Sequence, residues 1–267
     1  MTDAWFEVAF GAHYPALYAH RDRAEAALCF DLLPTMAPLS PHGKLVLDLG
    51  CGDGRHLEFL VKAGLPCVGL DLSSPLLELA SQRSQGAPLI RGDMRAIGLK
   101  EQSLDSVLSL FTAFGYFGPL QDNAVVVEGV SRILCSGGHW FLDYFNCDQV
   151  VQELGSGQDF VREREVGNMR IRETRRYSAR DSQVSKEVEL HPVPSSIQST
   201  DPAPHEQPLP HEGLRYTEKV AVFSLAEMDQ LALKHGLERV ASAGSYDGAE
   251  LSKGHRWILV YRKTKMQ

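Results

Sequence analysis

The stretch Val46–His56 concentrates residue types that suit ligand binding. Its apolar start is typical of a buried strand and contains an acid, Asp48, which is followed by Gly50, Gly52 and Gly54 at alternate positions. A glycine-rich turn between a strand and a helix lets a ligand touch the backbone at the carboxyl edge of a sheet. An acid beside that turn fits a cationic ligand better than a pyrophosphate.

The spacing of these glycines separates two classes of ligand. A dinucleotide requires G-x-G-x-x-G, which brings its pyrophosphate to the helix N-terminus. Here Arg55 occupies the place of the third glycine, which disfavours an NAD-linked oxidoreductase. Arg55 and His56 begin the next helix, where a solvated helix start and a functional role are equally compatible with the sequence. Cys51 is interpreted as a small filler, because no activating base is near it in the sequence.

The elements that must position this turn alternate between strand and helix patterns from Leu45 to Phe145, and the pattern resumes after about Phe223. Such alternation predicts parallel βαβ units and an α/β fold. We expect a doubly wound, seven-stranded, mostly parallel sheet. Its expected strands cover residues 44–50, 66–73, 87–93, 104–111, 139–145, 237–248 and 255–263.

An interruption of about 75 residues follows the fifth strand, from Cys147 to Val222. Its first half is polar with apolar residues at roughly alternate positions, which predicts antiparallel strands. Its second half, about residues 191–211, is rich in proline, and we expect a flexible loop there. The arginines between Arg162 and Arg180 could form an RNA-binding strip, but Arg and Glu alternate there as they do on a solvated sheet edge.

Composition sets the broad class. The 267 residues carry a net charge of −7 at a pI of about 5.8, so we expect no nucleic-acid partner and no membrane partner. Five cysteines without a CxxC pair predict neither a disulfide framework nor a zinc site, and His and acidic residues show no metal-ligand spacing. The first ten residues lack a signal-peptide pattern, and we expect a cytoplasmic protein.

Several motifs occur in order. The run "VLDLGCGDG" is followed by "VGLDLS" ending near Asp71, by Gly92–Met94 after the third strand, by "SLFTAFGYF" after the fourth, and by "ILCSGGHWFLD" before the fifth. In these motifs the chain resembles the class I S-adenosylmethionine-dependent methyltransferases, and "SLFTAFGYF" is similar to a run found in a small-molecule branch. Ser136 stands where that family usually has proline.

The resemblance implies S-adenosyl-L-methionine as the cofactor and a Rossmann-like methyltransferase fold with an antiparallel β insert after the fifth strand. It implies an N-terminal helical cover at 1–40, a cofactor-binding core at 41–146 and 223–267, and an inserted lid at 147–222. Asp71 would accept the ribose hydroxyls and Asp93 would lie near the adenine amine. The implied cofactor-binding residues are Tyr14, Tyr18, Arg21, Asp48, Gly50, Cys51, Gly52, Asp71, Leu72, Asp93, Met94 and Phe111.

The function implied is methyl transfer to N or O of a small-molecule acceptor by in-line displacement, in a monomer or homodimer. Tyr116, Tyr144 and Asn146 lie at the ends of the fourth and fifth strands, where ligands lie in open α/β sheets, so we expect them to contact the acceptor. The alternatives are an RNA or protein methyltransferase, a non-catalytic S-adenosylmethionine-binding protein and, less favoured, the NAD-linked enzyme.

Overall fold

The chain is described by a computed structural model in which residues 5–11, 14–17, 23–39, 43–118, 120–167, 169–193 and 213–264 are placed. A seven-stranded sheet runs in the order β10-β11-β5-β4-β1-β2-β3. Only β11 runs antiparallel to its neighbours in this sheet, so the predicted fold class is confirmed. The strands are β1 (Leu45–Leu49), β2 (Cys67–Asp71), β3 (Leu89–Arg91), β4 (Leu104–Ser109), β5 (Leu134–Phe145), β10 (Leu237–Ala243) and β11 (Arg256–Lys263).

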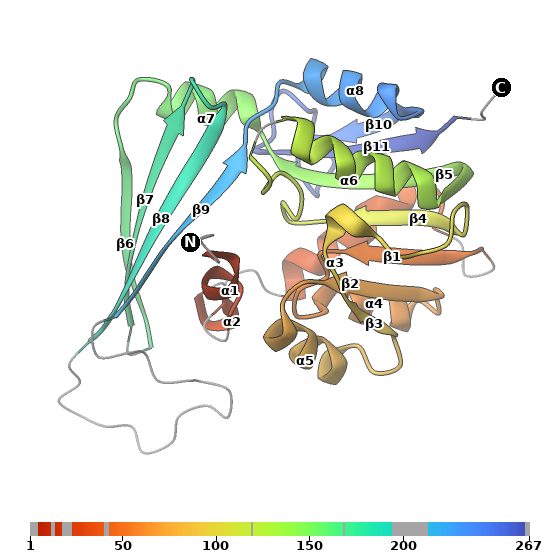
Figure 1. Cartoon of the computed structure of the whole chain (residues 1–267), viewed down its shortest axis with the longest axis horizontal. Helices are drawn as coiled ribbons and strands as arrows, with labels where there is room; N and C mark the ends of the chain where they lie inside the picture. The colour runs from red at the N-terminus through yellow and green to blue at the C-terminus, as the bar shows by residue number, and fades with distance from the viewer. Residues whose placement is uncertain are drawn as a thin grey trace.

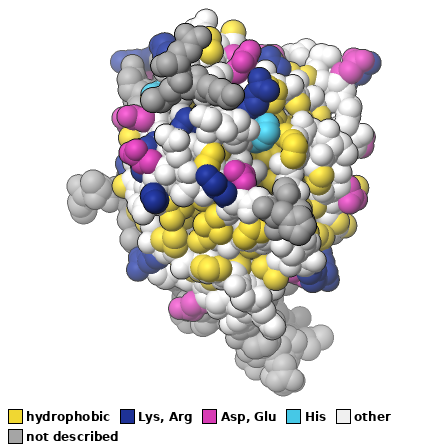
Figure 2. Space-filling view, turned by 90° about the vertical axis from the view of Figure 1, so that its right-hand side faces the viewer, with side chains coloured by type: hydrophobic (Ala, Val, Ile, Leu, Met, Phe, Trp, Pro, Cys, Tyr) yellow, Lys and Arg dark blue, Asp and Glu magenta, His cyan; other side chains and the backbone are white. Residues whose placement is uncertain are grey.

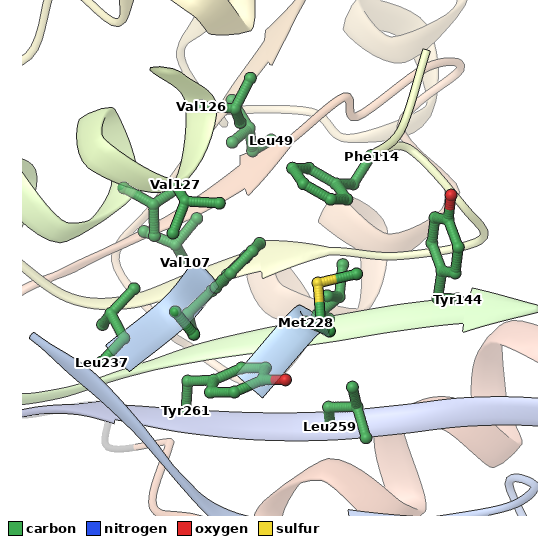
Figure 3. Packing of buried hydrophobic residues seen from close by; sticks show 14 of the residues in the cluster. Leu49, Val107, Phe114, Val126, Val127, Tyr144, Met228, Leu237, Leu259 and Tyr261 are labelled. Atoms are coloured by element: carbon green, nitrogen blue, oxygen red, sulfur yellow. The ribbon is translucent and has the colours of Figure 1, made fainter. Parts of the chain in front are cut away.

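Helices cover both faces of the sheet, as a buried parallel sheet requires (Figure 1). One face packs against α6 (Leu120–Ile133) and α8 (Leu225–Lys234), and Figure 3 shows part of this cluster. The other face packs against α3 (Arg23–Met36) and α4 (Arg55–Lys62), with α5 (Ser74–Arg83) beside α4. A short 3₁₀ helix, η1 (Met94–Ala96), follows β3.

Local caps explain where two of these helices begin. The Ser73 hydroxyl accepts a hydrogen bond from the Leu76 N–H at 3.3 Å, with Pro75 in the first turn. Ser73, the first of two adjacent serines, is therefore the N-cap of α5. At α8 a capping box is present, because Ser224 and Glu227 each accept from the other's N–H.

A second sheet forms the insert after β5, as predicted. It follows α7 (Cys147–Leu154) and pairs four antiparallel strands in the order β6-β7-β8-β9. The proline-rich stretch 194–212, where we expect a flexible loop, lies outside the described residues. The strands are β6 (Phe160–Val166), β7 (Met169–Ser178), β8 (Gln183–Pro192) and β9 (Leu214–Ala221).

The arginines of this insert are largely paired with acids. Arg164 and Arg175 lie within 4 Å of Glu173, and Arg176 lies 2.8 Å from Asp159. Arg170 and Arg172 pair with glutamates of β6. Their charges are balanced within the sheet, which supports the solvated-edge interpretation over an RNA strip.

Two short N-terminal helices lie between the insert and the core (Figure 1). These are α1 (Trp5–Ala9) and α2 (Tyr14–Leu17). Ala9 and Leu17 are buried in a cluster with insert residues that include Ile171 and Val188. By contrast, α3 packs on the main sheet, so only the first part of the expected 1–40 cover lies beside the insert.

A polar contact also holds α2 against the insert. The Arg164 guanidinium of β6 donates a hydrogen bond to the Leu17 carbonyl at 2.8 Å and lies 3.3 Å from the Glu173 carboxylate. Leu17 is the last residue of α2, where helical carbonyls lack intrahelical partners. The cation therefore satisfies a helix end that the hydrophobic cluster already buries.

Figure 2 shows the face reached by a quarter turn from the view of Figure 1. Cationic and anionic side chains are interspersed around a hydrophobic area, and no single sign of charge dominates the view. Within the described residues, no helix combines the length and apolar character that a membrane crossing needs.

We predict that Arg164→Gln loosens the N-terminal helices without unfolding the core. Losing one charge-assisted hydrogen bond, worth about 1.5 kcal/mol, should raise amide hydrogen exchange in residues 6–17 by roughly tenfold. The control is Arg170→Gln, since Arg170 pairs with Glu165 in the same sheet, with both side chains more than half exposed. Equal exchange in both variants would contradict a holding role for Arg164.

Candidate active site

A cleft of about 650 Å³ opens at the carboxyl edge of β1, β2, β3 and β4. Its floor is the loops that follow these strands, and Phe6, Phe10 and Tyr14 of the N-terminal segment form its roof. Ligands of open α/β sheets lie at this edge, so the cleft is the candidate active site. None of the described residues of the insert lines it.

The glycine turn after β1 is shaped by close backbone contacts. Gly50 has φ +81°, and a Cβ there would lie 2.7 Å from the Ala113 Cβ. At Gly52, with φ +53°, a Cβ would meet only the Leu76 Cδ1 at 4.0 Å, so this backbone faces the open cleft. The turn therefore packs against the loop after β4 on one side and leaves space for a ligand on the other.

Asp71 ends β2 and ties two loops together. Its carboxylate accepts hydrogen bonds from the Gly52 N–H and the Ser73 N–H, both at 2.8 Å. Burial raises the pKa of Asp71, and the two backbone donors oppose that rise. A carboxylate has about four lone-pair sites, so Asp71 keeps acceptor capacity for a ligand in the cleft that it lines.

Asp93, Met94 and Leu72 line the cleft where β2 and β3 end. Asp93 caps η1 and forms a bidentate pair with Arg95. The hydrogen bond from Arg95 is the main reason that the pKa of Asp93 is lowered. The acid is thus ionised and fixed at the outer end of the cleft.

Aromatic side chains meet above the loop that follows β4. The Phe10 ring lies 5.4 Å from Tyr14 and 5.6 Å from Tyr116, both edge to face. All three rings line the cleft together with Phe111. Tyr18 and Arg21, expected beside Tyr14, lie outside the described residues, so their contacts stay predictions.

Two of the residues expected to contact the acceptor do not line the cleft. Tyr144 is fully buried in the core near Phe114 (Figure 3), and its hydroxyl donates to the Ala221 carbonyl. Asn146 is 4% exposed, caps α7 and donates to the Gly254 carbonyl at 2.8 Å. Both side chains hold structural positions, so of the three predicted acceptor residues only Tyr116 faces the cleft.

Asp48 and Cys51 differ in their access to the cleft. Cys51 lines it, but burial raises the pKa of its thiol far above the ordinary value, so it stays protonated and is a poor nucleophile. Asp48 is 1% exposed and lies behind the turn. Its Oδ2 has no hydrogen-bond partner in the described part of the chain.

The sequence left the roles of Arg55 and His56 open, and it gave no sign of a third group near the site. His56 is 4% exposed and its ring lies 5.0 Å from that of Phe111, while the Arg55 guanidinium lies 4.6 Å from the same ring. The alternative of a solvated helix start is therefore wrong for His56. The strand pattern around Asp143 was visible, but nothing in it pointed to the partner Arg256 more than a hundred residues later.

Comparison with known proteins matches part of the chain to a family model. Residues 47–142 match the model of the family described as "Methyltransferase domain". A dTDP-3-amino-3,4,6-trideoxy-alpha-D-glucopyranose N,N-dimethyltransferase from Streptomyces venezuelae is 30% identical over 146 residues, which cover 52% of this chain and 61% of that protein. The chain thus spans about six tenths of the length of this curated relative.

Solved structures share the whole fold. A methyltransferase from Clostridium acetobutylicum matches with a TM-score of 0.75 at 16% identity, over 95% of this chain and 96% of that one. An amino pentose methyltransferase from Micromonospora echinaspora, solved with bound S-adenosylmethionine, matches with a TM-score of 0.64 at 21% identity, over 93% and 96%. Residues 47–142 thus match a methyltransferase domain, and the described chain shares the fold of these solved methyltransferases.

The residues of the cleft fit that cofactor. The open backbone at Gly52 admits close approach, and the Asp71 carboxylate faces the same space. Aromatic rings such as Tyr14 and Tyr116 offer π faces that attract a positively charged sulfur. The ribose and the positively charged sulfur of this cofactor therefore have complementary groups in the cleft.

We predict that Asp48 makes stability pH-dependent. Burial, aided by the Asp71 charge, raises the pKa of Asp48 to about 7 from its ordinary 3.8. Between these values the folded protein holds a proton that the unfolded chain has released, so stability falls as the pH rises through this window. Asp48→Asn should remove this loss.

The measurement is urea unfolding of both proteins from pH 5 to pH 8. Across that range, the free energy of unfolding of Asp48→Asn should rise by roughly 2–3 kcal/mol relative to that of the wild type. Parallel pH profiles for the two proteins would show that Asp48 is already ionised in the fold.

Proposed function

We propose that the protein transfers a methyl group from S-adenosylmethionine to an amine nitrogen of a small molecule. The observation that carries the proposal is the order of groups along one sheet edge. Asp93 follows β3, Asp71 ends β2, the glycine turn follows β1, and Phe111 follows β4. The order suits a nucleoside at one end and a reacting sulfur at the other.

The cofactor would lie along this edge with its adenine near β3 and its sulfur near β4. Asp71 would accept hydrogen bonds from the ribose hydroxyls, and Asp93 with Met94 would meet the adenine. The chain at the ribose 5′ carbon would then cross the glycine turn toward the loop after β4. Gly50 and Cys51 belong to this turn and line the cleft, and Asp48 lies behind the turn. We therefore keep all three residues in the proposed cofactor site.

Bound there, S-adenosylmethionine supplies a methyl group on a positively charged sulfur. The contribution of the chain is to hold and orient the reactants and to exclude water. Phe10, Tyr14 and Tyr116 close the cleft above this end and stabilise positive charge through their ring faces. Positioning alone supplies a large share of the barrier reduction in such a displacement, so no strong base is required.

The acceptor is proposed as an amine for two reasons. The aromatic roof suits the positive charge that develops on a nitrogen nucleophile as it is methylated. In addition, the Streptomyces venezuelae relative is an N,N-dimethyltransferase of an amino sugar nucleotide. The remainder of the acceptor would enter near Tyr116, the one predicted acceptor residue that lines the cleft.

We predict that Asp71→Asn weakens the binding of S-adenosylhomocysteine by about 1.5–3 kcal/mol, because hydrogen bonds to a charged acceptor are replaced by weaker ones. The amide still accepts from one backbone N–H, so the loops should stay folded. The measurement is titration calorimetry, with Asp159→Asn on the exposed edge of the insert as control. Wild-type affinity in a folded Asp71→Asn protein would remove Asp71 from the ribose site.

We predict turnover with amines rather than phenols or carboxylates in a panel that includes amino sugar nucleotides. Because only the neutral amine attacks, the rate should rise with pH up to the pKa of the acceptor amine. The measurement is transfer of a labelled methyl group. Exclusive O-methylation would overturn the amine assignment, and cofactor binding without transfer to any acceptor would support a non-catalytic binder.

A further inference from the structure

The loop after β4 carries two adjacent residues in the left-handed region. Phe111 has φ +55° and Thr112 has φ +62°, and both line the cleft. Outside glycine such conformations cost about 1–3 kcal/mol each, and they persist only where the surroundings enforce them. Something must therefore hold this backbone in place.

The holding group is Asp143 of the neighbouring strand β5, which is fully buried. Its Oδ2 accepts a hydrogen bond from the Phe111 N–H at 2.7 Å. Its own carbonyl accepts from the Thr112 N–H at 3.0 Å. One residue thus fixes both strained peptide groups.

Arg256, at the start of β11, completes the arrangement. Its Nε donates to the Asp143 Oδ1 at 2.5 Å and its Nη2 donates to the Thr112 Oγ1 at 3.2 Å. The guanidinium also lies 5.4 Å from the centre of the Phe111 ring. The Tyr246 hydroxyl donates to the Asp143 Oδ2, which also accepts from the Phe111 N–H, so both oxygens of the buried carboxylate have partners.

A second Arg–Asp–Tyr group in the chain provides a comparison. Arg239 binds Asp229 through two nitrogens, and the Tyr261 hydroxyl donates to the same carboxylate. Neither Arg239 nor Asp229 lines the cleft. The two groups share their chemistry, but only the one with Asp143 and Arg256 contacts the strained loop.

We propose that the Asp143–Arg256 ion pair is a positioning pair that presents Phe111 and Thr112 to the methionine end of the cofactor. The inference rests on the cofactor direction proposed above, in which the chain at the ribose 5′ carbon reaches β4. Asp71 and Asp93 are on β2 and after β3, away from this loop. Loss of the pair should therefore weaken the binding of the amino acid half of the ligand and leave the binding of the adenosine half unchanged.

The test is Arg256→Lys, which keeps the positive charge but lacks the fork that reaches Asp143 and Thr112 together. Calorimetry measures the affinity for S-adenosylhomocysteine. A competition assay measures the affinity for 5′-methylthioadenosine, which lacks the amino acid. We expect affinity for the first ligand to fall about tenfold and for the second to stay within twofold. Arg239→Lys should leave both unchanged.

A rescue variant separates positioning from general damage. Thr112→Gly accepts a positive φ without strain, so Arg256→Lys/Thr112→Gly should recover most of the affinity that Arg256→Lys loses. If Arg256→Lys does not fold, Thr112→Val tests the same contact, with an expected threefold loss for S-adenosylhomocysteine alone.

Unchanged affinity for S-adenosylhomocysteine, equal losses for both ligands, or no recovery in the double variant would each overturn the proposal. Failure of the cofactor direction itself is recognised separately. In that case Asp71→Asn would leave 5′-methylthioadenosine binding intact, whatever the Arg256 variants show.

Discussion

The carboxylate of Asp71 is the interaction on which the cleft depends. It accepts from Gly52 in the loop after β1 and from Ser73 in the loop after β2. The loop after β4 joins them, because Ala113 packs where a Gly50 side chain would be. Three strand-end loops thus meet at the cleft floor, two of them through the Asp71 carboxylate and the third through the packing of Ala113 on Gly50.

Short-range patterns predicted much of this floor because its determinants are local. Glycines at alternate positions and an acid at a strand end identified the turn and Asp71, and alternating strands and helices gave the sheet. Boundaries follow less directly from local residue types: Gly137 and Gly138 have the composition of a helix end, yet α6 ends at Ile133 and both glycines lie in β5. Glycine occurs in both settings, so its presence alone does not distinguish them.

Strand alternation could not decide which side chains of β5 face the cleft. Asp143 and Tyr144 point to opposite faces of a sheet that helices cover on both sides, and both are fully buried. The predicted role for Tyr144 failed because a position near the end of a strand does not establish exposure. The partners of Asp143 come from Tyr246 and Arg256, and a sequence read without homologues holds no signal for such distant contacts.

The insert acts on the cleft through the N-terminal helices. Its described side chains do not line the cleft, yet they bury Ala9 and Leu17 of the N-terminal segment whose Phe10 and Tyr14 form part of the roof. Lifting the roof would expose this apolar cluster at about 25 cal/mol for each Å² and break the contact of Arg164 with Leu17. The insert therefore stabilises the closed cleft. Opening the cleft must either move the roof and the insert together or separate them at that free-energy cost.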